Sequence, residues 1–173
     1  MPEAAAALNP PARGSIARGL FVAILVLIAD QATKWWILEI MLVRPPPERI
    51  IPVAPFFDLV LVWNRGVSFG LFNNDSGVNA GIFSVLASVI VIGLLAWLRR
   101  AKDPIIVLGI GLVIGGAVGN VIDRLVHRAV VDFLDFYVGA WHWPAFNVAD
   151  AAICVGVFAL VLDGLLPRRD RRT

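Results

Sequence analysis

Four long apolar runs dominate this chain and limit the folds open to it. Each run is long enough to cross roughly 30 Å of hydrocarbon as a helix. Because 59% of the residues are hydrophobic and only 16% are charged, a soluble domain of ordinary composition is excluded. We therefore predict an all-α membrane protein with a single membrane-embedded domain at residues 16–167. Its four transmembrane helices are expected at about residues 17–39, 79–98, 104–123 and 145–166.

Basic residues gather at the ends of the apolar runs, and this distribution predicts the orientation in the membrane. One side holds Arg13, Arg18, Arg99, Arg100, Lys102, Arg168, Arg169, Arg171 and Arg172. The other side holds Arg44, Arg49, Arg65, Arg124 and Arg128. Since cytoplasmic loops are enriched in Lys and Arg, both termini are predicted to be cytoplasmic. Residues 1–15 are then a flexible cytoplasmic tail and residues 168–173 a basic one. This pattern gives no reason to expect a nucleic-acid partner.

Polar residues cluster at the predicted outer ends of the third and fourth runs. The cluster comprises Asn120, Asp123, Arg124, Asp132, Asn147 and Asp150. A carboxylate near hydrocarbon costs roughly 2.5–3.5 kcal/mol at a helix centre, so such groups persist mainly where a bundle interior or water cavity uses them. Two close carboxyls cannot both ionise easily, so one holds a proton while the other stays charged. The cluster therefore predicts an acid and base pair of the aspartic protease type, without deciding which two acids form it.

Asp30 and Lys34 place a further charged pair inside the first run. They lie four residues apart and so share one helical face, which lets them form an ion pair within the bilayer. They could support a polar site on the outer side, but we favour a structural ion pair.

The segment between the first two runs predicts a small sheet at the membrane surface. Residues 56–63 are rich in β-branched and aromatic side chains, which favours a strand. Asn64, Arg65 and Gly66 then form a predicted turn. In the third run, Gly111, Gly115 and Gly119 recur every four residues, which predicts close helix packing within the bundle or with another chain.

Cysteine and histidine offer no metal chemistry. Cys154 is the single cysteine and lies in an apolar run, so we interpret it as a small buried hydrophobic residue. His127 and His142 lack metal-ligand spacing and are predicted to be surface residues. We therefore expect no metal site and no cofactor.

Five short motifs occur in order along the chain. They are DQATK at 30–34, NRGVSFG at 64–70, GGAVGNVIDR at 115–124, VVDF at 130–133 and FNVAD at 146–150. Through them the chain resembles bacterial prolipoprotein signal peptidase, also called signal peptidase II, from about Arg18 to Leu166. In the second motif, Arg65, Val67 and Ser68 fill variable positions, which should adjust only loop packing.

The resemblance implies a membrane-embedded aspartic endopeptidase of the bacterial inner membrane. Its substrate would be a diacylglyceryl-modified prolipoprotein, cut on the N-terminal side of the lipidated cysteine, and globomycin would inhibit it. The catalytic pair would be Asp132 and Asp150, with the active site at the extracytoplasmic face and a β cradle beside it. Asp123 would support the site, and a monomer is expected. Membrane lipid would surround the domain.

Four further residues are candidates for holding the peptide backbone and orienting the pair. Buried amides and a guanidinium satisfy peptide carbonyls, which is why these residue types suit that role. The candidates are Asn64, Asn120, Arg124 and Asn147, and for each a purely structural role is an equal alternative.

Three other functions fit parts of the sequence. Ser68 and Lys34 could form a Ser and Lys peptidase, although pairing with Asp30 would keep Lys34 charged and a poor base. A proton-coupled transporter also places acids in a helical bundle, but nearer the midplane and often with an internal repeat. An assembly subunit built on the glycine face would leave the outer polar cluster unexplained.

Overall fold

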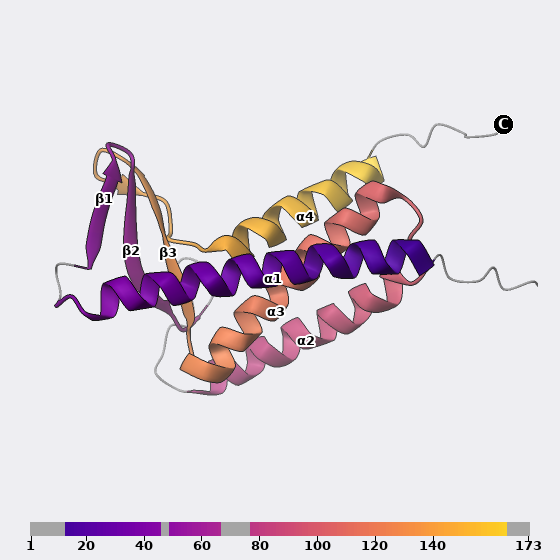
Figure 1. Cartoon of the computed structure of the whole chain (residues 1–173), viewed down its shortest axis with the longest axis horizontal. Helices are drawn as coiled ribbons and strands as arrows, with labels where there is room; N and C mark the ends of the chain where they lie inside the picture. Colours follow the sequence, from indigo (N-terminus) through magenta and orange to yellow (C-terminus); the bar gives the residue numbers. More distant parts are fainter. Residues whose placement is uncertain (1–12, 46–48, 67–76, 166–173) are drawn as a thin grey trace, which may run out of the picture.

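Four helices and a small antiparallel sheet make up the part of the chain that the structure, a computed structural model, describes (Figure 1). These residues are 13–45, 49–66 and 77–165. The helices are α1 (Arg13–Leu42), α2 (Gly77–Leu98), α3 (Pro104–His127) and α4 (Val148–Leu165). The strands are β1 (Ile50–Ala54), β2 (Phe57–Asn64), β3 (Val130–Val138) and β4 (Trp141–His142). All four helices are long and apolar enough to cross a membrane, which confirms the predicted fold class.

Some predictions lie wholly or partly outside the described residues. Among them are the C-terminal tail, the first twelve residues of the N-terminal tail and positions 67–70 of the NRGVSFG motif, with Ser68.

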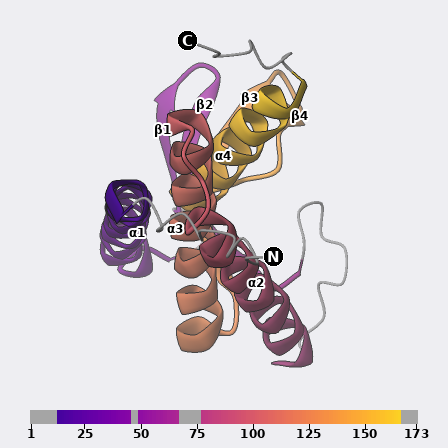
Figure 2. The same cartoon turned by 90° about the vertical axis from the view of Figure 1, so that its right-hand side faces the viewer.

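Helix α3 lies at the centre of the bundle, with α1, α2 and α4 around it (Figure 2). Its start follows the predicted signals: Asp103 accepts a hydrogen bond from the backbone N–H of Ile105 at 2.8 Å, and Pro104 fills the first helical position. A Cβ atom on Gly115 would approach the carbonyl oxygen of Ala23 to 2.5 Å, and one on Gly116 would collide with that of Ala149. The predicted glycine face of Gly111, Gly115 and Gly119 therefore packs internally against α1, and Gly116, which was not predicted, packs against α4.

Helix α2 shows most clearly how the bundle meets its surroundings. Its outward side chains are large and apolar, including Ile82, Val85, Val89 and Ile92, which are all more than half exposed. An exposed surface of this kind is stable in hydrocarbon and unfavourable in water. This exposure agrees with a span that faces lipid.

Helix α1 is longer than a bilayer requires, and its last turns support the sheet. Thirty residues at about 1.5 Å each exceed a hydrocarbon core of roughly 30 Å. In these turns Ile37 and Met41 are fully buried and pack with Phe133 of β3. The sheet is therefore fixed at one end of the bundle, which we call the sheet end.

The sheet brings distant segments together in the order β1-β2-β3-β4. Strands β2 and β3 are antiparallel, so Asn64 lies opposite Val130 and Val62 opposite Asp132. Beyond β4, Phe146 forms an isolated bridge with Leu134 of β3. The predicted strand at 56–63 corresponds closely to β2, but β3 was not predicted.

The helix boundaries differ from the predicted ones at the sheet end. Helix α3 continues to His127, four residues past its predicted end at 123. Helix α4 begins at Val148, although a start at 145 was predicted. The reason is that Phe146 exchanges backbone hydrogen bonds with Leu134, at 2.9 and 3.1 Å, and an extended residue cannot also be helical.

Candidate active site

Asp132 lies in β3 and is almost fully enclosed, with 2% of its surface exposed. Each of its carboxyl oxygens accepts a hydrogen bond from a neutral side-chain amide. Asn64, at the end of β2, donates to Oδ2 at 3.0 Å. Asn147, just before α4, donates to Oδ1 at 2.7 Å. Asp132 is therefore buried, and its carboxyl oxygens accept hydrogen bonds from neutral amides rather than from a cation.

Asp150 lies in the first turn of α4 and is half buried. Its backbone N–H donates to Asn147 Oδ1 at 2.9 Å, and its Oδ2 accepts from the backbone N–H of Asn147 at 3.3 Å. This reciprocal arrangement has the pattern of a capping box, with Asn147 as the N-cap. Asn120 of α3 donates to Asp150 Oδ1 at 2.8 Å. Asn147 therefore connects Asp150 to Asp132, and we call these two acids the carboxyl pair.

The two acids of the carboxyl pair affect each other electrostatically. Burial, together with the nearby charge of Asp150, raises the pKa of Asp132 from 3.8 to about 7, although the amides of Asn64 and Asn147 oppose the shift. Asp132 therefore holds a proton in a large fraction of molecules near neutral pH. A carboxyl that can give up or take a proton in this range is suited to acid and base catalysis.

A second buried polar group lies beside the carboxyl pair, and we call it the lysine cluster. Its members are Asp30, Gln31, Lys34 and Asp123, and the three charged ones are at most 3% exposed. Lys34 Nζ lies 2.8 Å from both Asp30 Oδ2 and Asp123 Oδ2, and donates to Asn120 Oδ1 at 3.0 Å. All three protons of the ammonium group thus have acceptors. The predicted pair of Asp30 and Lys34 is present, but Lys34 also binds Asp123.

Backbone groups complete the lysine cluster and join it to the surrounding elements. Asp30 Oδ1 accepts from the N–H of Ala149 in α4 at 2.9 Å. Asp123 Oδ2 accepts from the N–H of Val131 in β3 at 3.0 Å. These bonds connect three helices and the sheet through two carboxylates.

Arg124 is half buried on α3 and brings a second cation to the site. Its Nη1 donates to the backbone oxygen of Asn120 at 3.2 Å, and its guanidinium lies 5.6 Å from the centre of the Phe83 ring. Its charge interacts with Asp150 and Asp132. Among the described residues, no group of three or more His, Cys, Asp or Glu side chains could hold a metal ion.

A cavity of about 480 Å³ opens beside Asp150. Apart from Asp150, it is lined by apolar side chains and Cys154, from residues 143–146 and the first turns of α4. The interpretation of Cys154 as a buried residue is wrong, because its side chain is exposed. Helix α4 packs on α3 through Ala149 and Gly156, which turns Cys154 away from that contact. His127 and His142 are exposed, as predicted.

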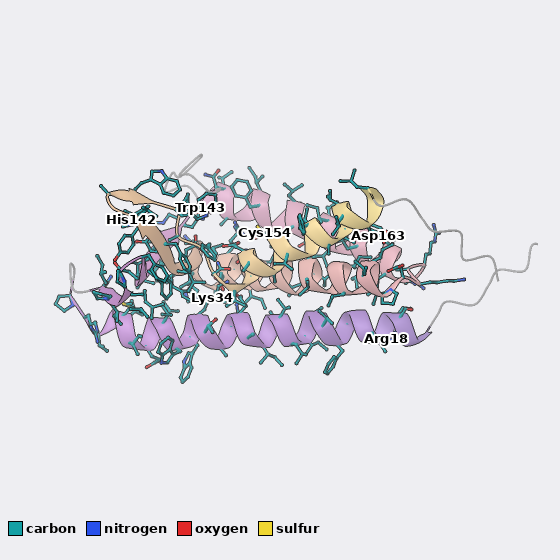
Figure 3. The ribbon with its side chains drawn as sticks, turned by 90° about the horizontal axis from the view of Figure 1, so that it is seen from above. Arg18, Lys34, His142, Trp143, Cys154 and Asp163 are labelled. Carbon is teal, nitrogen blue, oxygen red and sulfur yellow. The ribbon has the colours of Figure 1, made fainter. Side chains whose placement is uncertain are left out.

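The structure brings all nine predicted site residues together near the sheet end. Figure 3 labels one of them, Lys34, at that end; Arg18 and Asp163, which are not site residues, are labelled at the opposite end. The nine are Asp30, Lys34, Asn64, Asn120, Asp123, Arg124, Asp132, Asn147 and Asp150. Gln31 was missed: its amide donates to Asp30 Oδ2 at 3.2 Å and to Asp123 Oδ1 at 3.0 Å. A polar residue beside two intramembrane charges was the available signal.

Several known proteins are similar to this chain. Residues 22–166 match the family model described as "Signal peptidase (SPase) II". A protein of Methylobacterium radiotolerans named "Lipoprotein signal peptidase" is 47% identical over 156 residues, covering 88% of this chain and 90% of that protein. A protein of Methylorubrum extorquens with the same name is 45% identical over 150 residues, covering 86% of each chain.

A solved structure shares the fold. It is a bacterial membrane enzyme determined by the in meso method at 2.3 Å resolution. Its TM-score to this chain is 0.75 at 26% sequence identity, and the match covers 91% of this chain and 95% of the other.

Proposed function

Because this chain belongs to the signal peptidase II family, a group of multi-pass bacterial inner-membrane proteases that process prolipoproteins, we propose that Asp132 and Asp150 are its catalytic residues. The substrate we propose is a prolipoprotein whose lipobox cysteine carries a diacylglyceryl group. The bond cut is the peptide bond on the N-terminal side of that cysteine. Family membership leaves the transporter and assembly-subunit alternatives without support.

The mechanism we propose uses one proton shared by the carboxyl pair. The ionised acid removes a proton from a water molecule, whose oxygen attacks the scissile carbonyl carbon. The protonated acid donates its proton to the carbonyl oxygen, which gives a neutral gem-diol. The acids then exchange roles: one takes a diol proton while the other protonates the leaving nitrogen, and the C–N bond breaks. No covalent enzyme intermediate is required.

The observation that carries this proposal is the shared environment of Asp132 and Asp150. Asn147 hydrogen-bonds to both acids, and the charge of Asp150 contributes to a pKa of about 7 for Asp132. A pair with one proton near neutral pH holds an acid and a base at once. Asn64 donates to Asp132 and Asn120 to Asp150, which orients the two carboxyls, and Arg124 adds positive charge to the site.

The proposed orientation places the carboxyl pair at the extracytoplasmic face and both termini in the cytoplasm. It is supported by the excess of Lys and Arg near the opposite ends of the helices. Reporter fusions at the C-terminus, one active only in the cytoplasm and one only outside it, test this orientation. A reporter active outside the cytoplasm would contradict it.

A cleavage assay tests the catalytic residues. A diacylglyceryl-modified precursor is incubated with the detergent-purified protein, and loss of the signal peptide is followed as a gel shift. Asp132→Asn and Asp150→Asn are each expected to reduce the rate by about 10³-fold or more, because each removes the acid and base function. Normal cleavage by either variant would refute the carboxyl pair.

Two matched control variants test whether the removal of an acid outside the carboxyl pair also reduces cleavage. Asp135→Asn changes an acid in the same strand as Asp132, and Asp163→Asn changes one in the same helix as Asp150. Both should cleave at the wild-type rate. Globomycin is expected to inhibit the wild-type protein, and the active species is expected to elute as a monomer in detergent.

A further inference from the structure

Asn120 forms the contact that joins the lysine cluster to the carboxyl pair. Its Oδ1 accepts a hydrogen bond from Lys34 Nζ at 3.0 Å, and its Nδ2 donates to Asp150 Oδ1 at 2.8 Å. Lys34 is 2% exposed and Asn120 7%, so water has little access to this connection. A continuous path therefore runs from an ammonium ion in α1 to a carboxyl in α4.

The chemistry of lysine fixes the orientation of the Asn120 amide. A protonated lysine has only donors, so the amide must present its oxygen to Lys34. Asn147 Nδ2, at 3.4 Å from the same oxygen, favours this orientation too. The NH₂ group of Asn120 must then face Asp150. Since an NH₂ group donates and does not accept, it stabilises the ionised form of the carboxyl that it meets.

Other groups around Asp150 favour the same ionised form. Asp150 lies in the first turn of α4, where the helix dipole and the free backbone N–H groups stabilise negative charge. The N–H of Asn147 donates to its Oδ2, and Arg124 of α3 contributes positive charge. The charge of Asp132 across the site acts in the opposite sense.

Asp132 has less support for a negative charge, although the charges of Lys34 and Arg124 act on it as well. It lies in a strand rather than at a helix N-terminus, and its carboxyl oxygens accept only from the neutral amides of Asn64 and Asn147. Its burial is also greater than that of Asp150. The two acids of the pair are therefore not equivalent.

We propose that Lys34 is a positioning residue which, through Asn120, keeps Asp150 ionised as the general base and leaves the shared proton on Asp132. This inference rests on the proposed function, because it divides the two catalytic roles between the acids. The raised pKa of Asp132 agrees with the assignment. It also gives Lys34 a part in the reaction although Lys34 forms no hydrogen bond to either acid of the pair.

The pH dependence of kcat/KM for precursor cleavage tests the proposal. Its acidic limb reports the first proton lost by the pair and its basic limb the second. The test variant combines Lys34→Met with Asp30→Asn, which leaves the net charge of the lysine cluster unchanged and removes the donor to Asn120. We expect the acidic limb to move up by about one pH unit, so that cleavage falls about tenfold on that limb. An acidic limb at the wild-type pH would overturn the proposal.

Three other variants make the result specific. Asp30→Asn alone keeps Lys34 on Asn120, so its acidic limb should lie at or below the wild-type pH. Asn64→Leu removes a donor from Asp132 and should move the basic limb upward, whereas movement of the acidic limb would reverse the assignment. If the double variant does not stay monodisperse in detergent, Asn120→Leu removes the amide that links Lys34 to Asp150 and must raise the acidic limb.

Failure of this inference and failure of the proposed function give different results. If Asp132→Asn or Asp150→Asn still cleaves, the carboxyl pair itself is wrong. If both are inactive but neither the double variant nor Asn120→Leu moves the acidic limb, only the role of Lys34 is wrong.

Discussion

The lysine cluster and the carboxyl pair each contain two acids at the sheet end, but their partners differ. Asp30 and Asp123 share the ammonium group of Lys34 at 2.8 Å and also accept backbone N–H bonds. Asp132 and Asp150 accept hydrogen bonds from asparagine side chains and a backbone amide. Each group contains two acids, but only the acids of the lysine cluster contact a cation directly.

This difference explains why one group is structural and the other is suited to chemistry. In the lysine cluster each buried carboxylate contacts the ammonium group of Lys34, and this pairing holds the surrounding elements in place. Two carboxyls stabilised mainly by neutral amides cannot easily carry two charges, so they retain a proton that can be transferred. Burial alone does not distinguish the groups, since Asp123 is 3% and Asp132 2% exposed.

The largest effect on stability is expected from removing the cation. Lys34→Met leaves Asp30 and Asp123 buried without their ammonium partner, which should lower the free energy of unfolding by about 3–5 kcal/mol. Unfolding in mixed micelles, followed by tryptophan fluorescence, measures this loss. Changing Asp30 and Asp123 to Asn in the same variant should recover most of the stability. A loss below about 1 kcal/mol in Lys34→Met would show that the lysine cluster is not a structural ion pair.

The next effect concerns the carboxyl pair and its response to pH. The pKa of Asp132 is about 7 in the folded protein and 3.8 as a reference, so folding favours its protonated form. The contribution of Asp132 to the free energy of unfolding is fully present below about pH 4 and is lost as the pH rises through about 7. We expect the free energy of unfolding to fall by about 2–4 kcal/mol between these two pH values. Unfolding measured from pH 4 to 8 tests this, and Asp132→Asn should remove that part of the slope. An unchanged slope in the variant would contradict the shifted pKa.

The sequence predicted most of the fold because the relevant signals are local. Long apolar runs identify transmembrane helices wherever they occur, and Asp103 with Pro104 marked the start of α3. The predicted strand at 56–63 rested on the same kind of local composition. Strand β3 was missed, since residues 130–138 carry two acids and a strand is stabilised only by partners elsewhere in the chain.

The polar residues of the site were predicted individually, but their contacts were not. A charge in an apolar run is conspicuous, so Asp30, Lys34, Asp123 and Asp150 were all identified. Which acid binds Lys34 depends on contacts between helices that are far apart in the sequence, such as Lys34 with Asp123. Even the separation of Asp132 from Asp123 as a catalytic candidate came from family resemblance. Spacing along one chain does not contain this information.

A smaller effect is expected at Asn147, which serves both the fold and the carboxyl pair. Asn147→Ala removes the N-cap of α4 and a donor to Asp132, and should lower stability by about 1–2 kcal/mol. Asp103→Ala removes the N-cap of α3, outside the site, at a cost of about 1 kcal/mol. Thermal unfolding measures both losses. Only Asn147→Ala should also reduce precursor cleavage; equal cleavage by the two variants would limit Asn147 to capping.

The smallest effect is expected for an acid that belongs to neither group. Asp135 of β3 lies 2.8 Å from the half-exposed His142, and Asp58 lies directly opposite it in β2. A hydrogen bond with a half-exposed partner contributes about 0.5–1.5 kcal/mol to the free energy of unfolding, and like charges opposite each other in a sheet oppose it by about 0.2–1 kcal/mol. Asp135→Asn removes both the contact with His142 and the repulsion from Asp58, so the free energy of unfolding should stay within about 0.5 kcal/mol of wild type. Added salt should change even this difference little, because screening weakens both terms together. A loss of 2 kcal/mol or more in thermal unfolding would mean that burial and a bound cation do not separate the structural acids from the others.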